Sequence, residues 1–247
     1  FETAMHRLGG AVIGFSSAES TSTAKGETLA DTIRTVDQYA DIIAMRHPQI
    51  GSARIAADAA EAPVLNGGDG AGQHPTQALL DVYTIKHELG HVDGATIALV
   101  GDLKNGRTVH AGAELYKHYN CRLILVAPEQ LQMPAEIVAR LREHHVEVEE
   151  TTDLAAAMAK ADVLYMTRIQ KERFSDPAEY ERLKDSYILT SEMIESIRPN
   201  IRVLHPLPRV NEITTDVDRL PGAAYFRQVH NGVYIRMALI ALVMGRI

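Results

Sequence analysis

A glycine-rich stretch from Asn66 to Asp81 carries the side chains best suited to chemistry in this sequence. It follows the apolar run 63–65, contains four glycines within six residues, and leads to Pro75, after which apolar residues recur at near-helical spacing. Glycine permits backbone shapes that a Cβ forbids, and proline favours the first turn of a helix. The pattern therefore predicts a strand, a tight loop and a helix start, where free backbone N–H groups favour an anion or a polarised carbonyl.

His74 and Gln77 stand three residues apart, so both fall on one face of the predicted first helical turn. A histidine nitrogen can donate to an oxygen, and a glutamine amide can both donate and accept. The pair suits a planar, amide-like group. Taken alone, the stretch is also compatible with a simple helix cap beside a polar loop.

Other polar side chains follow predicted strands further along the chain. In parallel sheets, ligands bind beyond the carboxyl ends of the strands. The candidates in these positions are Arg46, His74, Gln77, Arg168 and Gln170, the run 102–108, and the turn His205–Arg209. A single arginine is more often a solvated surface charge, but the repeated placement at strand ends predicts one shared crevice. Planar guanidinium groups suit carboxylates and phosphates, so the expected ligand is anionic.

Alternating strands and helices must position these side chains. The sequence predicts strands at 11–15, 41–45, near Val64, and at 95–100, 122–127, 146–149, 162–166 and 202–204. It predicts helices at 1–9, 27–39, 52–59, 75–89, 106–118, 134–144, 154–160, 178–184 and 223–244. This alternation is typical of parallel sheets. We expect an α/β fold with two domains, each a mostly parallel sheet flanked by helices, joined by interdomain helices.

The turn-rich run 90–94 predicts the junction between the two domains. We expect a first domain at 1–90, a second at 91–225, and a C-terminal helix at 226–247 that returns to the first domain. The first residues already have a helical pattern, with no initiator methionine and no preceding cap. We therefore expect that a segment upstream of Phe1 is missing from the sequence.

Composition excludes several classes of protein. The net charge of −7 argues against a general binder of nucleic acids or membrane surfaces. The longest apolar stretch, Met237–Met244, falls short of the roughly 20 residues that a membrane span needs. The lone cysteine, Cys121, lies in an apolar run, which predicts a buried thiol rather than a nucleophile and fits a reducing, cytoplasmic location.

Four other kinds of site match the sequence poorly. The run Gly101–Thr108 imitates a nucleotide phosphate loop but has Arg107 in place of the lysine that reaches the phosphates. No G-x-G-x-x-G run follows Val100, so a dinucleotide site is not expected. No Cys or His spacing matches a zinc site, and no G-x-S-x-G elbow occurs. We therefore expect no metal and no cofactor.

Taken together, the motifs resemble the catalytic chains of the aspartate carbamoyltransferase family. The matching runs are Lys25–Glu27, Met45–Pro48, His74–Gln77, Gly101–His110, Tyr165–Arg173 and His205–Arg209. The wider carbamoyltransferase family shares the His-Pro-x-Gln turn. Its ornithine-specific members are expected to have a cysteine at the place of Pro206 and a Ser-Met-Gly loop at the place of 167–173, so these residues favour aspartate as the acceptor.

The resemblance implies a reaction and a set of roles. The reaction is carbamoyl transfer from carbamoyl phosphate to L-aspartate, giving N-carbamoyl-L-aspartate and phosphate in de novo pyrimidine biosynthesis. The implied catalytic residues are Arg46, His74 and Lys25. The implied carbamoyl phosphate contacts are Arg46, His74, Gln77, and the main-chain carbonyls of Pro206 and Leu207. The implied aspartate contacts are Lys25, Arg107, Thr108, Arg168 and Gln170.

The resemblance also implies an assembly. In the family, the loop with Lys25, and with Ser22 as a less certain companion, reaches a neighbouring subunit's site, which implies a homotrimer with shared active sites. Regulatory chains or fusion partners stay open. The family's Ser-Thr-Arg-Thr-Arg phosphate loop precedes the Phe-Glu at which this sequence starts, so we expect little activity without it. The alternative is a catalytically silent homologue that acts as an assembly or binding module.

Overall fold

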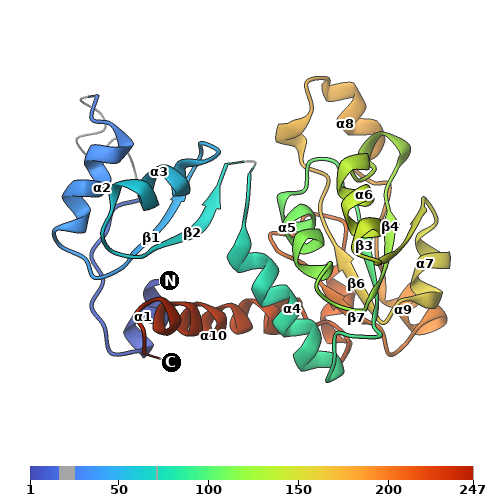
Figure 1. Ribbon diagram of the computed structural model, residues 1–247. Coiled ribbons are helices and arrows are strands. Elements are labelled where there is room, and N and C mark those ends of the chain that lie inside the picture. Colours follow the sequence, from blue (N-terminus) through green and yellow to red (C-terminus); the bar gives the residue numbers. More distant parts are fainter. Residues whose placement is uncertain (17–25, 71, 247) are drawn as a thin grey trace. The chain divides into compact units, whose positions relative to one another are not determined.

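The computed structural model describes residues 1–16, 26–70 and 72–246, and Figure 1 shows their helices and strands. The chain divides into two compact units, which we call unit 1 (Phe1–Thr76 with Gly232–Ile247) and unit 2 (Gln77–Asn231). Both divisions fall inside helices, α4 (Pro75–Leu89) and α10 (Tyr225–Val243), rather than in loops. No helix among the described residues is both long and apolar enough to cross a bilayer.

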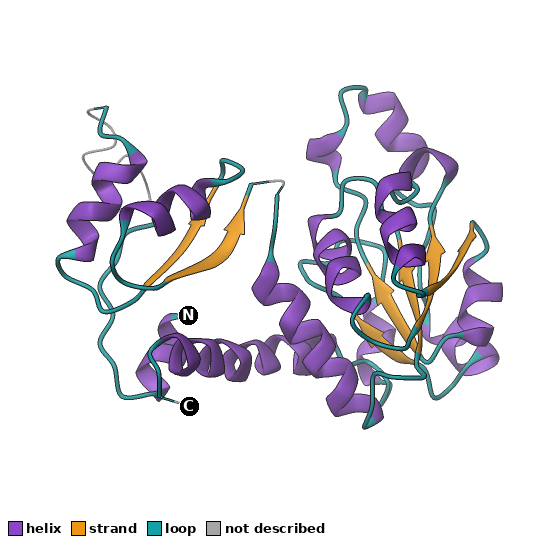
Figure 2. Ribbon diagram, viewed as in Figure 1, coloured by secondary structure: helices purple, strands orange, loops and turns teal. Residues whose placement is uncertain are grey.

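Unit 1 contains a two-stranded parallel sheet, drawn as two orange arrows in Figure 2. Its elements are α1 (Glu2–Arg7), α2 (Leu29–Asp37), β1 (Ile43–His47), α3 (Ser52–Ala59) and β2 (Val64–Asp69), with the first residues of α4 and the end of α10. Parallel strands need a crossover connection, which α3 supplies here. Ile33, Ile43 and Ala56, from α2, β1 and α3, lie in one small buried cluster that joins these elements.

The prediction of a strand at 11–15 is wrong, because these residues have no regular secondary structure. Val12, Ile13 and Phe15 are exposed, and no strand among the described residues pairs with the segment. An apolar run becomes a strand only when a neighbour takes up its hydrogen bonds, and nearby Gly14 lowers the intrinsic preference further.

Unit 1 also corrects the predicted ends of two strands. β2 continues through Gly67 and Gly68 to Asp69, where a loop was expected, and Arg46 lies within β1 rather than after it. Gly67 and Gly68 lie at a shift in register between the two strands, and pairing resumes beyond them, where His47 is opposite Asp69. The turn comes at Gly70, whose φ is +57°, and a Cβ there would lie 2.1 Å from the main-chain oxygen of Pro48. Only glycine fits this position without a shift of the backbone.

Unit 2 contains a five-stranded parallel sheet with the strand order β5-β4-β3-β6-β7. The strands are β3 (Thr96–Val100), β4 (Arg122–Val126), β5 (Glu147–Thr151), β6 (Val163–Met166) and β7 (Arg202–Leu204). The helices are α5 (Arg107–Tyr116), α6 (Ala135–Glu143), α7 (Leu154–Lys160), α8 (Pro177–Leu183) and α9 (Ser191–Ile197). Short 3₁₀ turns occupy Glu129–Leu131, Lys171–Arg173 and Thr215–Arg219.

The core of unit 2 has two layers, one on each face of the sheet. Successive side chains of a strand point to opposite faces, and in β3 Ile97 and Leu99 join one buried cluster while Ala98 and Val100 join the other. β3, β4 and β6 are therefore nearly continuous apolar runs, as expected for strands buried on both faces. These runs made the strands easy to predict from the sequence.

Helix α9 was not predicted, and its sequence explains why. Thr190 caps it by accepting the N–H of Met193 over 3.3 Å, but the helix is only seven residues long. Ser191 and Ile194 are its buried residues, so it lacks the repeated apolar stripe from which longer helices are recognised.

The strand order of unit 2 reverses between β3 and β6. From β3 the chain moves outward through β4 to β5, and then returns to place β6 on the other side of β3. Thr167, just past β6, donates its N–H to the main-chain oxygen of Val100 over 2.8 Å. Gly101 has a φ of +119°, and a Cβ there would lie 2.3 Å from the oxygen of Thr167. Such a reversal point is where doubly wound sheets bind ligands.

Candidate active site

In unit 1, Arg46 and His74 line the same cavity, which has a volume of about 1300 Å³. Arg46 comes from β1 and is exposed, whereas His74 stands directly before α4 and is buried. The structure thus brings together the two residues of this unit that the sequence predicted to act on one group. A fixed cation beside an imidazole suits a ligand with negative charge on oxygen.

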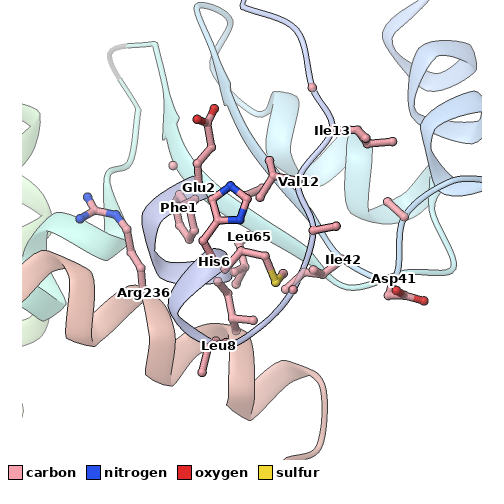
Figure 3. A pocket seen from close by; sticks show the side chains of 18 of the residues that line it. Phe1, Glu2, His6, Leu8, Val12, Ile13, Asp41, Ile42, Leu65 and Arg236 are labelled. Carbon is pink, nitrogen blue, oxygen red and sulfur yellow. The ribbon is translucent and has the colours of Figure 1, made fainter.

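The cavity contains a second arginine that sequence analysis missed. Arg236 rises from α10 beside Phe1, with its guanidinium carbon 5.4 Å from the centre of the phenyl ring, and Figure 3 shows both side chains. Burial lowers the pKa of Arg236, and no carboxylate within the described ranges forms an ion pair with it. In the sequence, Arg236 could have been noticed only as a lone charge inside the apolar C-terminal run. It adds a positive charge to the cavity that Arg46 and His74 line.

In unit 2, Gln77 lies in the first turn of α4 and is buried. Its Nε2 donates to Oδ1 of Asp81 over 2.8 Å, one helical turn further along. Asp81 is 1% exposed and also accepts from Tyr165 Oη (2.8 Å) and from Gln228 Nε2 (2.6 Å). Tyr165 is in turn hydrogen-bonded to the side chain of Thr108, a predicted aspartate contact.

Sequence analysis did not single out this buried polar network. Asp81 could have been noticed, because it is a carboxylate among the apolar residues Leu79, Leu80 and Val82 of a predicted helix. Burial raises the pKa of Asp81 to about 7, although hydrogen bonds from Gln228, Tyr165 and Gln77 act in the opposite direction. The Asp81 carboxyl group therefore changes its charge near neutral pH.

The turn after β7 is held by a buried histidine and a buried glutamate. His205 Nδ1 accepts the N–H of Leu207 over 2.8 Å, so the ring carries its proton on Nε2, which donates to Glu212 over 2.7 Å. Burial raises the pKa of Glu212, but hydrogen bonds from His205 and from main-chain N–H groups outweigh it, so the pKa lies below its ordinary value. The main chain of Leu207 has a φ of +53°, and the His205 contact supports this left-handed shape.

The loop after β3 does not have the interior of a phosphate loop. Asp102 is fully buried, and its Oδ1 accepts both the N–H of Asn105 (2.9 Å) and its side-chain amide (3.1 Å). The N–H of Gln170 also donates to Asp102. Burial is the main reason that the pKa of Asp102 is raised. A carboxylate therefore already occupies the place that a phosphate would need, which disfavours nucleotide binding here.

Four of the five predicted aspartate contacts occupy the same edge of the unit 2 sheet. Arg107 and Thr108 begin α5 after β3, and Arg168 and Gln170 follow β6, the neighbouring strand. All four side chains are partly buried. Unit 2 thus brings these four residues to the point where the strand order reverses.

The guanidinium of Arg168 is held by Glu172, four residues later. Both terminal nitrogens of Arg168 donate to the Glu172 carboxylate, with Nη1 at 3.2 Å from Oε2 and Nη2 bound to Oε1. Hydrogen bonding and attraction from Glu172 raise the pKa of Arg168. This pairing uses two of the five N–H groups of the guanidinium, so three stay available to a second carboxylate.

Three further predictions concern other parts of the chain. Lys25 and Ser22 lie outside the described residues. Cys121 is buried, as predicted, and burial raises the pKa of its thiol to about 11, so the thiolate that a nucleophile needs is scarce. Within the described ranges, no three His, Cys, Asp or Glu side chains are grouped so that they could hold a metal ion.

Two family descriptions match the chain. "Aspartate/ornithine carbamoyltransferase, carbamoyl-P binding domain" matches residues 1–87, and "Aspartate/ornithine carbamoyltransferase, Asp/Orn binding domain" matches residues 93–243. The chain therefore belongs to the aspartate/ornithine carbamoyltransferase family, as the resemblance predicted.

Within this family, the chain is similar to aspartate carbamoyltransferases. It is 58% identical over 245 residues to the aspartate carbamoyltransferase catalytic subunit of Thermococcus gammatolerans, covering 99% of this chain and 80% of that protein. Among solved structures, the catalytic subunit of M. jannaschii aspartate transcarbamoylase has a TM-score of 0.92 and 47% identity, over 99% of this chain and 79% of that chain. The Trypanosoma cruzi enzyme in complex with N-(phosphonacetyl)-L-aspartic acid has a TM-score of 0.87 and 46% identity, over 96% and 75%.

Proposed function

We propose that this chain catalyses transfer of the carbamoyl group from carbamoyl phosphate to the amine of L-aspartate. The products are N-carbamoyl-L-aspartate and phosphate, and the reaction is a step of de novo pyrimidine biosynthesis. The observation that carries the proposal is the 58% identity, across 99% of the chain, to an aspartate carbamoyltransferase catalytic subunit. The chain is thus an enzyme, a carbamoyltransferase that acts on aspartate.

Arg46 and His74 act on the carbamoyl group in this proposal. The neutral amine of aspartate attacks the carbamoyl carbon, and negative charge develops on the former carbonyl oxygen. Prepositioned donors at such an oxygen are worth about 3–4 kcal/mol each. The proposal is supported by the cavity that Arg46 and His74 line together. Because both residues contact the reacting group, we assign them catalytic as well as carbamoyl phosphate-binding roles.

The carbamoyl NH₂ group needs acceptors rather than donors. Gln77 supplies its side-chain Oε1, because its Nε2 is already bound to Asp81. The main-chain carbonyls of Pro206 and Leu207 supply the others, on a turn that His205 holds. The carbamoyl NH₂ has two N–H donors, so Gln77 Oε1 and one of these carbonyls fix the plane of the carbamoyl group, and the other carbonyl is left for the attacking amine.

Aspartate brings two carboxylates, and unit 2 supplies two arginines for them. Arg107 binds the α-carboxylate with Thr108 as its neighbour, and Arg168 binds the side-chain carboxylate with help from Gln170. The support is their common place at the reversal point of the sheet, and the fixed plane of Arg168. Phosphate is a good leaving group, so positioning supplies much of the catalysis.

The proposed domains follow one another along the chain. Residues 1–90 form the carbamoyl phosphate-binding domain, 91–225 form the aspartate-binding domain, and 226–247 form a helix that returns to the first. The family descriptions support a boundary near residue 90, since they match 1–87 as the first domain and 93–243 as the second. The return of the C-terminal helix is supported instead by Gly232–Ile247, which belong to the same compact unit as Phe1–Thr76.

The proposed assembly is a homotrimer with shared active sites. Lys25 reaches from one subunit into the site of the next, where it contacts aspartate and assists catalysis. Regulatory chains are compatible with the name "catalytic subunit" that the Thermococcus relative carries. The lone cysteine of the sequence, Cys121, fits a cytoplasmic location.

A bisubstrate analogue tests the proposal against a silent homologue. N-(phosphonacetyl)-L-aspartate joins a phosphonate to a dicarboxylate, and the Trypanosoma cruzi relative was solved in complex with it. We expect calorimetry to show tight binding by a protein that includes the family's upstream phosphate loop, and a colorimetric assay to show that this protein forms carbamoyl aspartate from both substrates. Binding without turnover would favour a silent binding module, and absence of both would refute the proposal.

A further inference from the structure

Asp81 is a buried carboxylate to which the reaction as described gives no role. It lies in α4, is 1% exposed, and has no ion pair with any cation within the described ranges. A buried carboxylate without a counter-ion is costly, and hydrogen bonds offset the cost only in part. An apolar residue at this position would avoid that cost, so the contacts of Asp81 call for a reason beyond stability.

The contact of Asp81 with Gln77 determines which end of the Gln77 amide is left to contact a ligand. An ionised carboxylate, which is the form of Asp81 above about pH 7, can only accept hydrogen bonds. Gln77 must therefore turn its NH₂ end toward Asp81, which it does over 2.8 Å, and its Oε1 is left for another partner. An acceptor on one side of a side-chain amide determines that its NH₂ end lies on that side. Gln77 thus offers an acceptor, which matches a carbamoyl NH₂ and repels a phosphate oxygen.

The second contact connects Asp81 to the turn after β7. Gln228, in α10, donates its Nε2 to the same oxygen of Asp81 over 2.6 Å. Its Oε1 then accepts the main-chain N–H of His205 over 2.9 Å. His205 begins the turn that carries Pro206 and Leu207. The Asp81 carboxylate therefore orients both the amide of Gln77 and the amide of Gln228, which holds the start of this turn.

We propose that Asp81 is a positioning residue that orients the side-chain amide of Gln77 so that its Oε1 accepts from the carbamoyl NH₂ group. Asp81 itself does not touch the substrate. The inference rests on the proposed function, because it takes the carbamoyl group as the ligand of Gln77. Asp81 thereby makes the site prefer the N–H donors of a carbamoyl group over the oxygen of an anion.

A double-mutant cycle tests the inference, with the dissociation constant of carbamoyl phosphate measured by calorimetry. Gln77→Ala removes the acceptor and should weaken binding about tenfold, the effect of one lost hydrogen bond. Asp81→Leu removes the group that orients Gln77 and should weaken binding by a similar factor. In the Gln77→Ala background, Asp81→Leu should weaken binding by a smaller factor than in the unsubstituted protein, because only the Gln228 amide is left to orient.

Asp81→Asn is the matched control. Its Oδ1 can still accept from Gln77 and Gln228, while its NH₂ group donates to the oxygen of Tyr165. Carbamoyl phosphate should therefore bind to it within about twofold of the unsubstituted protein. A purely structural role for Asp81 would not predict that the effect of Asp81→Leu becomes smaller when the Gln77 side chain is absent.

Each of the remaining outcomes would contradict the positioning role of Asp81, the role of Gln77 or the proposed function. Equal weakening by Asp81→Leu in both backgrounds, or no weakening in either, overturns the positioning role while the function stands. A Gln77→Ala protein that binds normally overturns the role of Gln77 and this inference together. An unsubstituted protein that binds no carbamoyl phosphate overturns the proposed function itself.

A second measurement serves if Asp81→Leu does not fold. In ¹⁵N-labelled protein, the side-chain NH₂ signal of Gln77 should shift as the pH passes about 7, where Asp81 ionises. The titratable groups that face Asp81 are Tyr165 and Tyr116, and burial raises the pKa of both well above 10, so neither titrates in this range. Asp81→Asn should abolish the shift. A Gln77 signal that titrates equally in Asp81→Asn overturns the inference.

Discussion

The main-chain N–H of Leu207 donates to Nδ1 of His205 over 2.8 Å, so the imidazole supports the turn that it begins. The opposite ring nitrogen donates to Glu212 over 2.7 Å, and both side chains are buried. The turn is thus braced from inside unit 2, which leaves the carbonyls of Pro206 and Leu207 for the proposed carbamoyl contact.

Two isosteric substitutions of His205 separate these contacts. In His205→Asn, the side-chain oxygen takes the place of Nδ1 and keeps the Leu207 contact, whereas in His205→Gln the side-chain NH₂ takes the place of Nε2 and keeps the Glu212 contact. We expect the turnover number to fall at least tenfold more in His205→Gln, because a misplaced carbonyl loses a positioned hydrogen bond. Steady-state kinetics with both substrates saturating measure this. Equal losses would show that the Leu207 contact does not matter.

Arg107→Lys keeps the positive charge but removes the planar fork. We expect the Michaelis constant for aspartate to rise more than tenfold, because lysine cannot bind a carboxylate through two parallel hydrogen bonds. The dissociation constant of carbamoyl phosphate should stay unchanged. Arg142→Lys, on α6, is a matched control that changes an exposed ion pair with Glu150. An unchanged Michaelis constant in Arg107→Lys would contradict the assignment.

Glu172→Gln should weaken aspartate binding without direct contact. It replaces one of the two oxygens that hold the guanidinium plane of Arg168, so the group loses its fixed orientation. We expect the Michaelis constant for aspartate to rise several-fold, with carbamoyl phosphate binding unaffected. Glu181→Gln, which removes a similar pairing with Lys184 on α8, is the control. If both variants behave alike, the effect does not pass through Arg168.

Asp81→Asn should change how stability depends on pH. Burial raises the pKa of Asp81 to about 7, whereas an aspartate in the unfolded chain has a pKa of about 3.9. Between these values the folded protein binds more protons than the unfolded chain, so stability falls as the pH rises, by up to about 1.4 kcal/mol per pH unit from this group. The loss is absent below pH 4 and complete above about pH 7.

Urea unfolding at pH 5, 6, 7 and 8 measures this dependence. The free energy of unfolding of Asp81→Asn, relative to the unsubstituted protein, should increase up to about pH 7 and then stay constant. Parallel pH dependence in the two proteins would show that Asp81 does not titrate in this window.

Mixing two inactive chains tests the shared site. Lys25→Ala and Arg46→Ala each remove one contributor to a site that two subunits build. In trimers that form at random from equal amounts of both, about a quarter of the sites would combine an intact Lys25 with an intact Arg46. We expect activity to return after joint refolding, as measured by carbamoyl aspartate formation. Activity that stays at the level of the separate chains would place Lys25 and Arg46 in the same subunit's site.

Much of the fold and of the site follows from local sequence patterns. Strands such as β3 and β6 were predictable because apolar runs of four to six residues mark buried parallel strands. The residues after them, such as Arg107 and Arg168, became candidates because ligands bind at that end of a sheet. The motifs around them also predicted the family, which the comparisons confirmed.

The sequence by itself therefore determined the α/β class, the family and the residues at the strand ends, because these depend on neighbours in the chain. Only the tertiary structure decided which apolar runs find a pairing partner, and so why 11–15 forms no strand. It also decided that Asp81 meets Gln228, 147 residues away, and that Arg236 lies in the cavity of His74. No local pattern encodes such contacts, because they form only when distant segments pack together and exclude water from the groups between them.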